Sequence, residues 1–573
     1  MKNITKRAFN NFKMPAGTTT TTPFSRRHIA ILLGIPATLA LAYYIYRRKS
    51  LSFKFRQGAI EGVVENNAAS KLSEEDAEEK QKRLLKEALS FKEKGNESYR
   101  KGKYDEAIEF YDKAIEKCPT EKKIDLAIFY QNRAASYEML QRWQHVKNDC
   151  TMALENNPKY PKAYARRAKA NQNLGNLYEC LDDITATCML ESFQNKKAVE
   201  DIECVLKSIA EKEATEHMQN RIPELPSAHF IKTFFGAFTQ DPIKSIDVTN
   251  DDITKGFARA KLGLDTEKYE DIVPGCTEEI NAADSKYRDE ALLLRGTIYT
   301  LMGLFQEAKD DFTILIDAAD ADPRLRASAL MRRATLYVQK EKKDLGFADY
   351  NEAEKLEPNN PDIYHNRAQI YVLLDQLDDA LVDYEKVLKL SPDYAMAYIQ
   401  KCYAEYRIAL VAQDQGRLMS ILNDFKNALG KYPNCVECYS LMAQVLCELG
   451  QFDESDQYFE KAIKMDPLNA GLHVHRGVMH LQWEGDMDKA INIISKAIEI
   501  DSKCEFAYEM LGTIAIQKAE LQKAVDTFEI AIKCARNFTE MSRLCALKCA
   551  AVAQLNVTEK LGIDVSAIVG LCK

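Results

Sequence analysis

Small, aromatic and proline residues recur along most of the chain at an interval of 34 residues. The segment "FKEKGNESYRKGKYDEAIEFYDKAIEKCP", which begins at Phe91, aligns with "YHNRAQIYVLLDQLDDALVDYEKVLKLSP" at 364–392. Both carry a small residue, an aromatic, an alanine, a tyrosine and a proline at the same offsets. The proline closes each unit because it cannot continue a helix. This pattern predicts a series of stacked, antiparallel helix pairs.

The residue types at fixed positions of the unit follow from the packing of its two helices. Position 8 is small, which allows two helices to approach closely, and the second helix brings alanine at position 20 and an aromatic residue at position 24 to fill the gap. The small residues at position 8 are Gly95, Ala134, Ala168, Gly296, Ala334, Ala368, Ala443, Gly477 and Gly512. The pattern is that of the tetratricopeptide repeat, which the chain resembles over most of its length.

The repeats fall into two arrays, so we expect an all-α superhelical solenoid. Three units fit residues 88–194. About eight more run from 253 to 538: a degenerate one, then units beginning near 289, 327, 361, 395, 436, 470 and 505. We assign 195–250 to a linker and 251–573 to the second array with capping helices. The first helices of such units line a concave face, where a ligand would bind.

Charge and cysteine content restrict the possible functions. Residues 1–60 hold eleven basic and no acidic residues, whereas the remainder holds 67 basic and 86 acidic residues, a balance of −19. An acidic body gives no electrostatic basis for binding nucleic acid. Fifteen scattered cysteines favour a reducing compartment. We predict no cofactor and no metal site, since the C-x-x-C at Cys435 and Cys438 lacks a second ligand pair.

An uncharged run of 18 residues at 29–46 predicts a short transmembrane helix between a basic tail at 1–28 and a charged tether at 47–87. Such an 18-residue helix would be about 27 Å long, barely the thickness of the hydrocarbon core. A signal anchor of the mitochondrial outer membrane fits this pattern, with the body in the cytosol. Two alternatives are a cleaved signal peptide, with a site at 40–42, and a mitochondrial transit peptide.

Five polar residues of the first array occupy first-helix positions that should face one concavity. Lys92 and Asn96 are positions 5 and 9 of the first unit, Asn132 is position 6 of the second, and Lys162 and Arg166 are positions 2 and 6 of the third. Two like charges four residues apart on one helix face repel each other unless an anion lies opposite. The arrangement therefore predicts an anion-binding site.

These residues resemble the dicarboxylate-clamp class of tetratricopeptide domains, through "FKEKGN", "YQNRAASY" and "PKAYAR". Domains of that class bind the carboxyl-terminal Glu-Glu-Val-Asp of the 70 and 90 kDa heat-shock chaperones. The resemblance implies that Lys92, Asn96 and Asn132 hold the main-chain carboxylate of the tail. It also implies that Lys162 and Arg166 bind its side-chain carboxylate and nearby carbonyls.

Between the arrays, "RIPELPSAHFIKTFFGAFTQDPI" at 221–243 concentrates three prolines and four phenylalanines, so we expect it to lie against the solenoid. The order of segments in the chain is similar to that of the seventy-kilodalton receptor subunits of the mitochondrial outer-membrane translocase: an anchor, a tether, a clamp, a linker and a second array. That resemblance implies a docking receptor for chaperones and hydrophobic precursor proteins, working with other translocase subunits. Candidates for a precursor groove are Leu293, Thr297, Met331, His365, Gln369 and Gln444.

The sequence lacks the motifs of common enzyme classes. No phosphate-binding loop, G-x-S-x-G or H-E-x-x-H motif is found, and the repeats leave no separate globular domain, so we predict that the chain is not an enzyme. Three histidines of one predicted helix, His473, His475 and His480, do not share a face. A membrane-tethered cochaperone or scaffold on another organelle, or an adaptor for signalling proteins, would use the same clamp and is the alternative.

Overall fold

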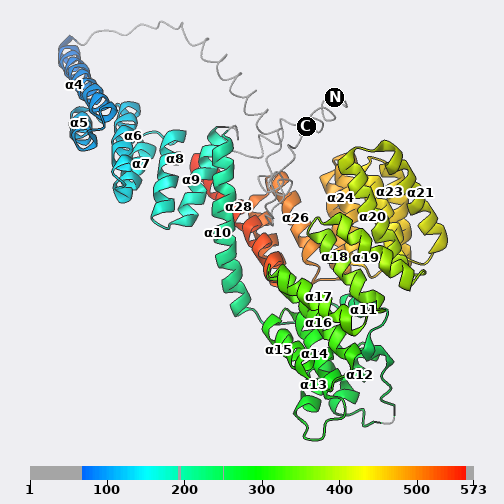
Figure 1. Ribbon diagram of the computed structural model, residues 1–573. Helices are drawn as coiled ribbons and strands as arrows, with labels where there is room; N and C mark the ends of the chain where they lie inside the picture. Colours follow the sequence, from blue (N-terminus) through cyan, green and yellow to red (C-terminus); the bar gives the residue numbers. More distant parts are fainter. Residues whose placement is uncertain (1–67, 192–194, 250, 563–573) are drawn as a thin grey trace.

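The computed structural model describes residues 68–191, 195–249 and 251–562, and throughout these ranges the regular structure is helical (Figure 1). The predicted all-α solenoid is confirmed. The predicted membrane span at 29–46 and the basic tail at 1–28 lie outside the described residues. Among the helices that are described, none is both long and apolar enough to cross a bilayer.

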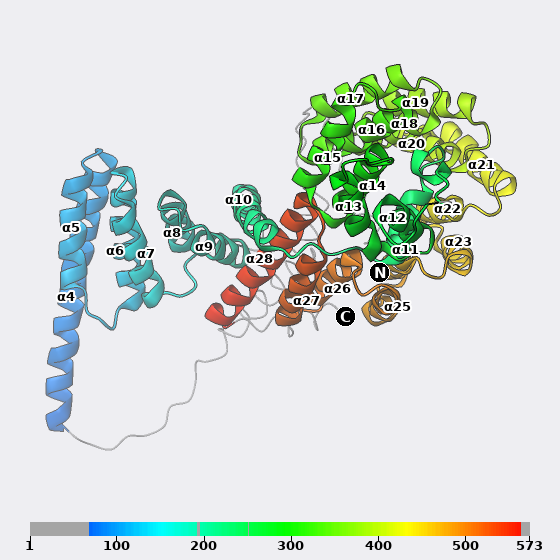
Figure 2. The same ribbon diagram turned by 90° about the horizontal axis from the view of Figure 1, so that it is seen from below.

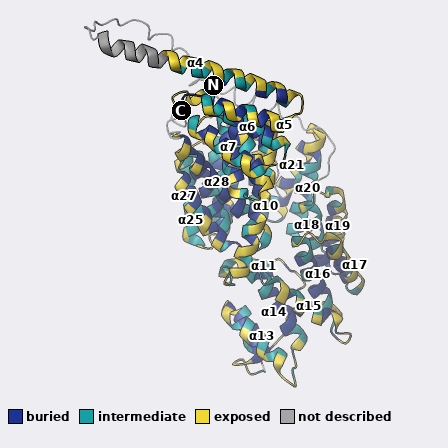
Figure 3. Cartoon of the chain, turned by 90° about the vertical axis from the view of Figure 1, so that its left-hand side faces the viewer, coloured by how far each residue is buried: buried dark blue, intermediate teal, exposed yellow. Residues whose placement is uncertain are grey.

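The first array consists of three helix pairs, as the repeat predicts. They are α4 (Ala68–Arg100) with α5 (Tyr104–Lys117), α6 (Lys123–Met139) with α7 (Trp143–Asn156), and α8 (Pro161–Asn173) with α9 (Leu177–Leu190). Helix α4 extends well before the first unit into the region expected to be a tether. It lies at one end of the stack, where much of its length is exposed (Figure 3).

The second array contains eight helix pairs in the described residues. The first pair, α12 (Gly256–Asp265) and α13 (Ile272–Asn281), is short and is the degenerate unit. The others are α14 (Arg288–Met302) with α15 (Phe305–Asp317), α16 (Pro323–Gln339) with α17 (Lys343–Leu356), α18 (Pro361–Leu373) with α19 (Leu377–Leu390), α20 (Ala395–Ala412) with α21 (Gln415–Lys431), α22 (Val436–Glu448) with α23 (Phe452–Met465), α24 (Ala470–Glu484) with α25 (Met487–Ile500), and α26 (Glu505–Gln517) with α27 (Leu521–Cys534). The extra residues of the unit at 395 lengthen α20 and α21.

The segment between the arrays is not a simple linker. It begins with a 25-residue helix, α10 (Lys196–Asn220), and continues as an extended stretch, the short helix α11 (Ala228–Gly236) and a 3-10 turn at Pro242–Ser245. Helix α10 packs on α9 and on a single 24-residue helix, α28 (Phe538–Leu561), that follows the last pair (Figure 2). One hydrophobic core runs through α9, α10, α27 and α28. The first array is thus joined to the carboxyl-terminal end of the second array.

In three units the glycine at position 8, Gly95, Gly296 or Gly512, lies directly against the aromatic residue at position 24. A Cβ atom on Gly296 would lie 2.7 Å from Cε1 of Phe312, and one on Gly95 would lie 2.7 Å from Cε1 of Tyr111. Both rings are buried. Each ring therefore fills the space that the missing side chain leaves, which fixes the separation of the two helices in a pair.

A second recurring contact holds the pairs together and was not predicted from the sequence. In five units an arginine at position 7 of the first helix forms two hydrogen bonds to an aspartate 16 residues later, with Nη2–Oδ1 distances of 2.6–2.8 Å. Such bidentate, largely buried ion pairs have a defined geometry. The pairs are Arg133–Asp149, Arg167–Asp183, Arg295–Asp311, Arg333–Asp349 and Arg367–Asp383.

The close contact predicts opposite effects for two glycine-to-alanine changes. Gly296→Ala should lower the free energy of unfolding by about 1–3 kcal/mol, because the new methyl group must displace the buried ring of Phe312. The control is Gly430→Ala in α21, where a Cβ atom meets nothing within 4 Å. Gly430→Ala should raise the free energy of unfolding by a few tenths of a kcal/mol, and by no more than about 1 kcal/mol, because alanine has a higher helix propensity than glycine. Denaturant unfolding followed by circular dichroism measures both; a Gly296→Ala protein as stable as the wild type would contradict the packing argument.

Candidate functional site

The five predicted clamp residues lie on three consecutive first helices. Lys92 and Asn96 lie one turn apart on α4, Asn132 lies on α6, and Lys162 and Arg166 lie one turn apart on α8. Helix α6 contacts both α4 and α8, so it is the middle element of this surface. The repeat brings these residues together because equivalent helix positions point in similar directions.

Hydrogen bonds connect the asparagines across the first two helices. The Nδ2 atom of Asn132 donates to Oδ1 of Asn96 at 3.2 Å, and the hydroxyl of Tyr111 donates to the same oxygen at 2.8 Å. These two donors fix the Asn96 amide so that its oxygen faces Asn132 and Tyr111. The Asn96 Nδ2 atom donates to the exposed Glu93 carboxylate at 3.3 Å.

Arg166 connects the third helix to the second. Its Nη1 atom donates to the main-chain oxygen of Gln131, beside Asn132, at 3.3 Å, and its Nε atom donates to Glu138 at 2.7 Å. Lys169 forms an ion pair with the same carboxylate at 2.7 Å. Burial alone would raise the pKa of Glu138, but hydrogen bonds from Lys169 and Arg166 outweigh it and hold that pKa below the usual value. Glu138 is therefore an ionised internal partner of Arg166.

The two lysines of the site differ in their surroundings. Lys92 is partly buried and lies 2.7 Å from the exposed carboxylate of Glu93, whereas Lys162 is exposed in the first turn of α8. The positive end of the α8 dipole and the ammonium of Lys162 both attract an anion. Surface ion pairs contribute little, so an incoming carboxylate can replace Glu93 at Lys92 at small cost.

In the second array, the segment after α11 lies on the first-helix face. The main-chain N–H of Gln240 donates to the buried carboxylate of Asp362 at 2.8 Å, and the Thr239 hydroxyl donates to it at 2.6 Å. The Tyr394 hydroxyl donates to the main-chain oxygen of Ala237 at 3.0 Å. Asp362 belongs to α18, and Tyr394 immediately precedes α20. The aromatic linker therefore packs against the concave side of the solenoid.

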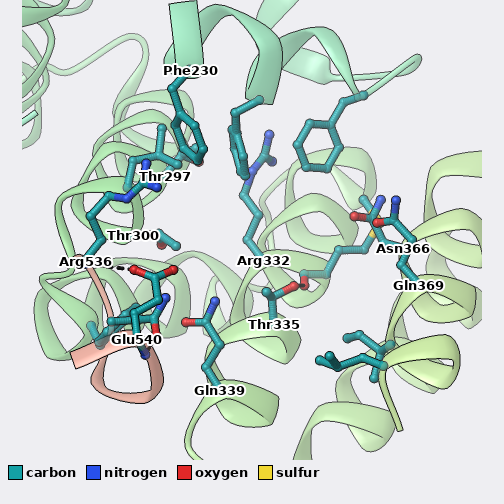
Figure 4. A pocket seen from close by; sticks show the side chains of 18 of the residues that line it. Phe230, Thr297, Thr300, Arg332, Thr335, Gln339, Asn366, Gln369, Arg536 and Glu540 are labelled. Carbon is teal, nitrogen blue, oxygen red and sulfur yellow. Dashed lines mark hydrogen bonds between the residues drawn. The ribbon is translucent and has the colours of Figure 1, made fainter. Parts of the chain in front are cut away.

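A cavity of about 380 Å³ lies between this linker and the first helices (Figure 4). Three linker rings, Phe230, Phe234 and Phe238, form one wall, and the opposite wall comes from α14, α16 and α18. Arg536, two residues before α28, and Glu540, in the first turn of α28, lie at one side. The cavity is thus apolar on its linker side, with amide, hydroxyl and charged groups elsewhere in its lining.

The six predicted groove residues have different positions. Three of them, Thr297, Met331 and Gln369, line the cavity. Leu293 is fully buried in the hydrophobic core, one turn before Thr297. Gln444, on α22, does not line the cavity and donates to the Ser440 hydroxyl at 3.3 Å.

His365 lies beneath the linker in a polar network. One ring nitrogen is 3.0 Å from the Tyr394 hydroxyl and the other is 3.0 Å from Oε1 of Gln400. Burial lowers the pKa of His365 to about 4. The ring is therefore neutral at physiological pH and helps to hold the residue, Tyr394, that binds the linker.

Sequence reasoning missed Arg332, which is 4% exposed in the wall of the cavity. Its Nη2 atom pairs with Asp241 at 2.7 Å, and the Phe238 ring lies 4.6 Å from its guanidinium carbon. Its Nε and Nη1 atoms have no hydrogen-bond partner. The neighbouring Arg333 forms the recurring pair with Asp349, so no repeat signal distinguished Arg332 in the sequence.

Comparison with known proteins agrees with this architecture. The tetratricopeptide repeat family matches residues 88–121, 361–394 and 436–469, which begin at three of the predicted unit starts. The mitochondrial import receptor subunit TOM70 of Mus musculus is 39% identical to the chain over 94% of the chain and 93% of that protein. The chain belongs to the TOM70 family. The human TOM70 is 40% identical over 84% of the chain and 81% of its own length.

Membership of the TOM70 family makes the protein a mitochondrial import receptor of the outer membrane and not an enzyme. The crystal structure of the yeast Tom70 covers 82% of the chain and 96% of its own length, with a TM-score of 0.48 and 23% identity. The TOM70 relatives confirm the expectation of an import receptor. They give no support to the alternative of a scaffold on another organelle.

The surroundings of His365 predict a pH-dependent stability. Because its folded-state pKa of about 4 lies below the usual 6.5, folding favours the neutral ring. The stabilisation is complete above pH 6.5 and is lost as the pH falls toward 4, by up to about 1.4 kcal/mol per pH unit. We expect His365→Gln to flatten the pH dependence of the free energy of unfolding in this window, measured by denaturant titration at several pH values. Equal slopes for the variant and the wild type would contradict a lowered pKa of His365 in the folded state.

Proposed function

We propose that this TOM70-family receptor has two docking sites. The first array binds the acidic carboxyl-terminal tail of the 70 and 90 kDa heat-shock chaperones, and the second array accepts hydrophobic precursor proteins for transfer to the translocase pore. Residues 29–46 anchor the chain in the outer membrane as a single span, with the two arrays in the cytosol. The observation that carries the proposal is the pair of hydrogen bonds that link three neighbouring helices: Asn132 donates to Asn96, and Arg166 donates to the main-chain oxygen of Gln131 beside Asn132.

The chemistry of the first site suits a terminal aspartate. Such a residue offers two carboxylates, one on the main chain and one on the side chain. Lys92, Asn96 and Asn132 supply one cation and two amides for the main-chain carboxylate. Lys162 and Arg166 supply two further cations for the side-chain carboxylate. Hydrogen bonds to charged groups are worth about 1.5–3 kcal/mol each, so a few of them suffice for micromolar binding of a short peptide.

Glu138 sets the selectivity of this site in our proposal. It neutralises Arg166 while no ligand is bound, and it lies between Arg166 and Lys169. A ligand must provide a side-chain carboxylate that competes with Glu138, which a neutral side chain cannot do. The site therefore disfavours a tail whose terminal aspartate is replaced by asparagine, because Glu138 then remains the better partner of Arg166.

The cavity of the second array supports the precursor site. Its phenylalanine wall can take apolar side chains, whereas the exposed amide of Gln369 offers hydrogen bonds to an extended or helical main chain. Met331 gives the wall a side chain that adapts to different shapes, which suits a receptor for many precursors. Contact between linker and solenoid makes the linker part of this site rather than a passive spacer.

Removal of one cation tests the chaperone site. Arg166→Ala should weaken binding of a Met-Glu-Glu-Val-Asp peptide by about tenfold or more, because the loss of one charge-assisted contact removes at least 1.4 kcal/mol. The matched control is Lys169→Ala, on the same helix and bound to the same Glu138 but outside the clamp. Isothermal titration calorimetry measures both variants. Equal affinities for Arg166→Ala and wild type would refute the clamp assignment.

The precursor site is tested by photocrosslinking. A photoreactive residue at Gln369, which is exposed and lines the cavity, should crosslink to a hydrophobic precursor presented by its chaperone. The control is the same residue at Val382, which is 68% exposed on the second helix α19 of the same unit. Gel analysis of radiolabelled precursor gives the yield. Equal crosslinking at both positions would show that the precursor has no preference for the cavity.

A further inference from the structure

The joint between the two arrays brings together four side chains that commonly bind metal ions. Helix α10 carries Glu213 and His217 one turn apart, and α28 carries Cys545 and Cys549 one turn apart. The two helices pack along each other (Figure 1). Residues four apart share one face of a helix, so each helix presents a two-ligand face.

The ligand atoms of three of these residues converge, and the fourth residue, Cys549, contacts one of the three. A carboxylate oxygen of Glu213, a ring nitrogen of His217 and Sγ of Cys545 lie within 4.8 Å of one another. The fourth group, Sγ of Cys549, is 3.4 Å from Oε1 of Glu213. Ligand atoms around one tetrahedral zinc ion lie about 3–4 Å apart, given metal–ligand distances of about 2.0–2.3 Å. Small rotations of the side chains would close the remaining distance.

We propose that Glu213, His217, Cys545 and Cys549 form a Zn²⁺ site that fastens the first array to the carboxyl-terminal end of the second. Two sulfurs, one imidazole nitrogen and one carboxylate oxygen are a donor set that suits zinc, while calcium and magnesium require oxygen ligands. Sequence reasoning did not find this site because the two ligand pairs are more than 300 residues apart.

The surroundings of the site balance its charge. Two thiolates and one carboxylate carry three negative charges, and Zn²⁺ with the ammonium of Lys548 carries three positive charges. Lys548 lies 3.0 Å from Oε2 of Glu213, and the Tyr178 hydroxyl donates to Oε1 at 2.8 Å. The tyrosine, from α9, orients the carboxylate as an outer-shell partner does in known metal sites. Binding of the metal displaces the thiol protons to solvent.

The proposed zinc site lies where the two arrays meet, so it would link them mechanically. Cys545 and Cys549 belong to the hydrophobic core that α9 and α10 share with α27 and α28. A metal ion there would connect helices that adjoin the clamp with helices that close the second array. Occupancy would restrict motion between the two arrays without contact to either docking site.

Cobalt spectroscopy tests the proposal on the full-length protein in detergent. After treatment with a chelator, addition of Co²⁺ should give visible bands of a tetrahedral complex and a near-ultraviolet thiolate-to-cobalt band, both saturating at one ion per chain. One equivalent of Zn²⁺ should abolish them. Cys204→Ser is the control, because this exposed cysteine lies on α10 outside the cluster and should leave the spectrum unchanged.

His217→Ala is the decisive variant, since His217 is exposed and its removal does not disturb the core. It should weaken Co²⁺ binding by about tenfold or more. The double change Cys545→Ser with Cys549→Ser should remove the thiolate band. Absence of that band in the wild type, or an unchanged affinity in His217→Ala, would overturn the zinc site. Chaperone-peptide affinity measured on the same samples should not change, so this result is independent of the proposed docking function.

Discussion

The close contact between a small first-helix residue and an aromatic second-helix residue is the constraint on which the rest of this solenoid depends. Gly296 and Phe312 show it most clearly, because no side chain larger than hydrogen fits without displacement of a buried ring. The contact sets the distance between paired helices, and the recurring arginine–aspartate pairs then fix their rotation. With distance and rotation set, equivalent positions of successive first helices face the same concave surface. Both candidate docking sites are consequences of that alignment.

Periodicity made much of this structure predictable. The unit starts near 361, 395, 436, 470 and 505 are the first residues of five helices, because each repeat contains its own start signal. The clamp residues Asn96 and Asn132 could be placed on adjacent helices for the same reason. Interactions outside the repeat could not be predicted. Glu138 as the partner of Arg166 and Arg332 as the partner of Asp241 depend on how helices and linker pack, which no local pattern specifies.

The two proposed docking sites would recognise their ligands by different physical means. The clamp gathers cations and amides at a partly exposed surface, where charge decides what binds and salt weakens the interaction. The cavity of the second array is enclosed by the phenylalanines of the linker, where apolar contact decides. A receptor with the two proposed docking sites needs both properties, since a chaperone tail is a constant signal and precursors vary in sequence.

The packing of α28 on α9 and α10 also affects how the chain folds as it leaves the ribosome. Helix α28 begins more than 300 residues after α10 ends, yet its side chains share one hydrophobic core with apolar residues of α10 such as Ile202, Val205 and Ile209. These side chains remain without their partner until almost the whole second array has been translated. During that interval the nascent chain exposes apolar surface that the finished receptor buries.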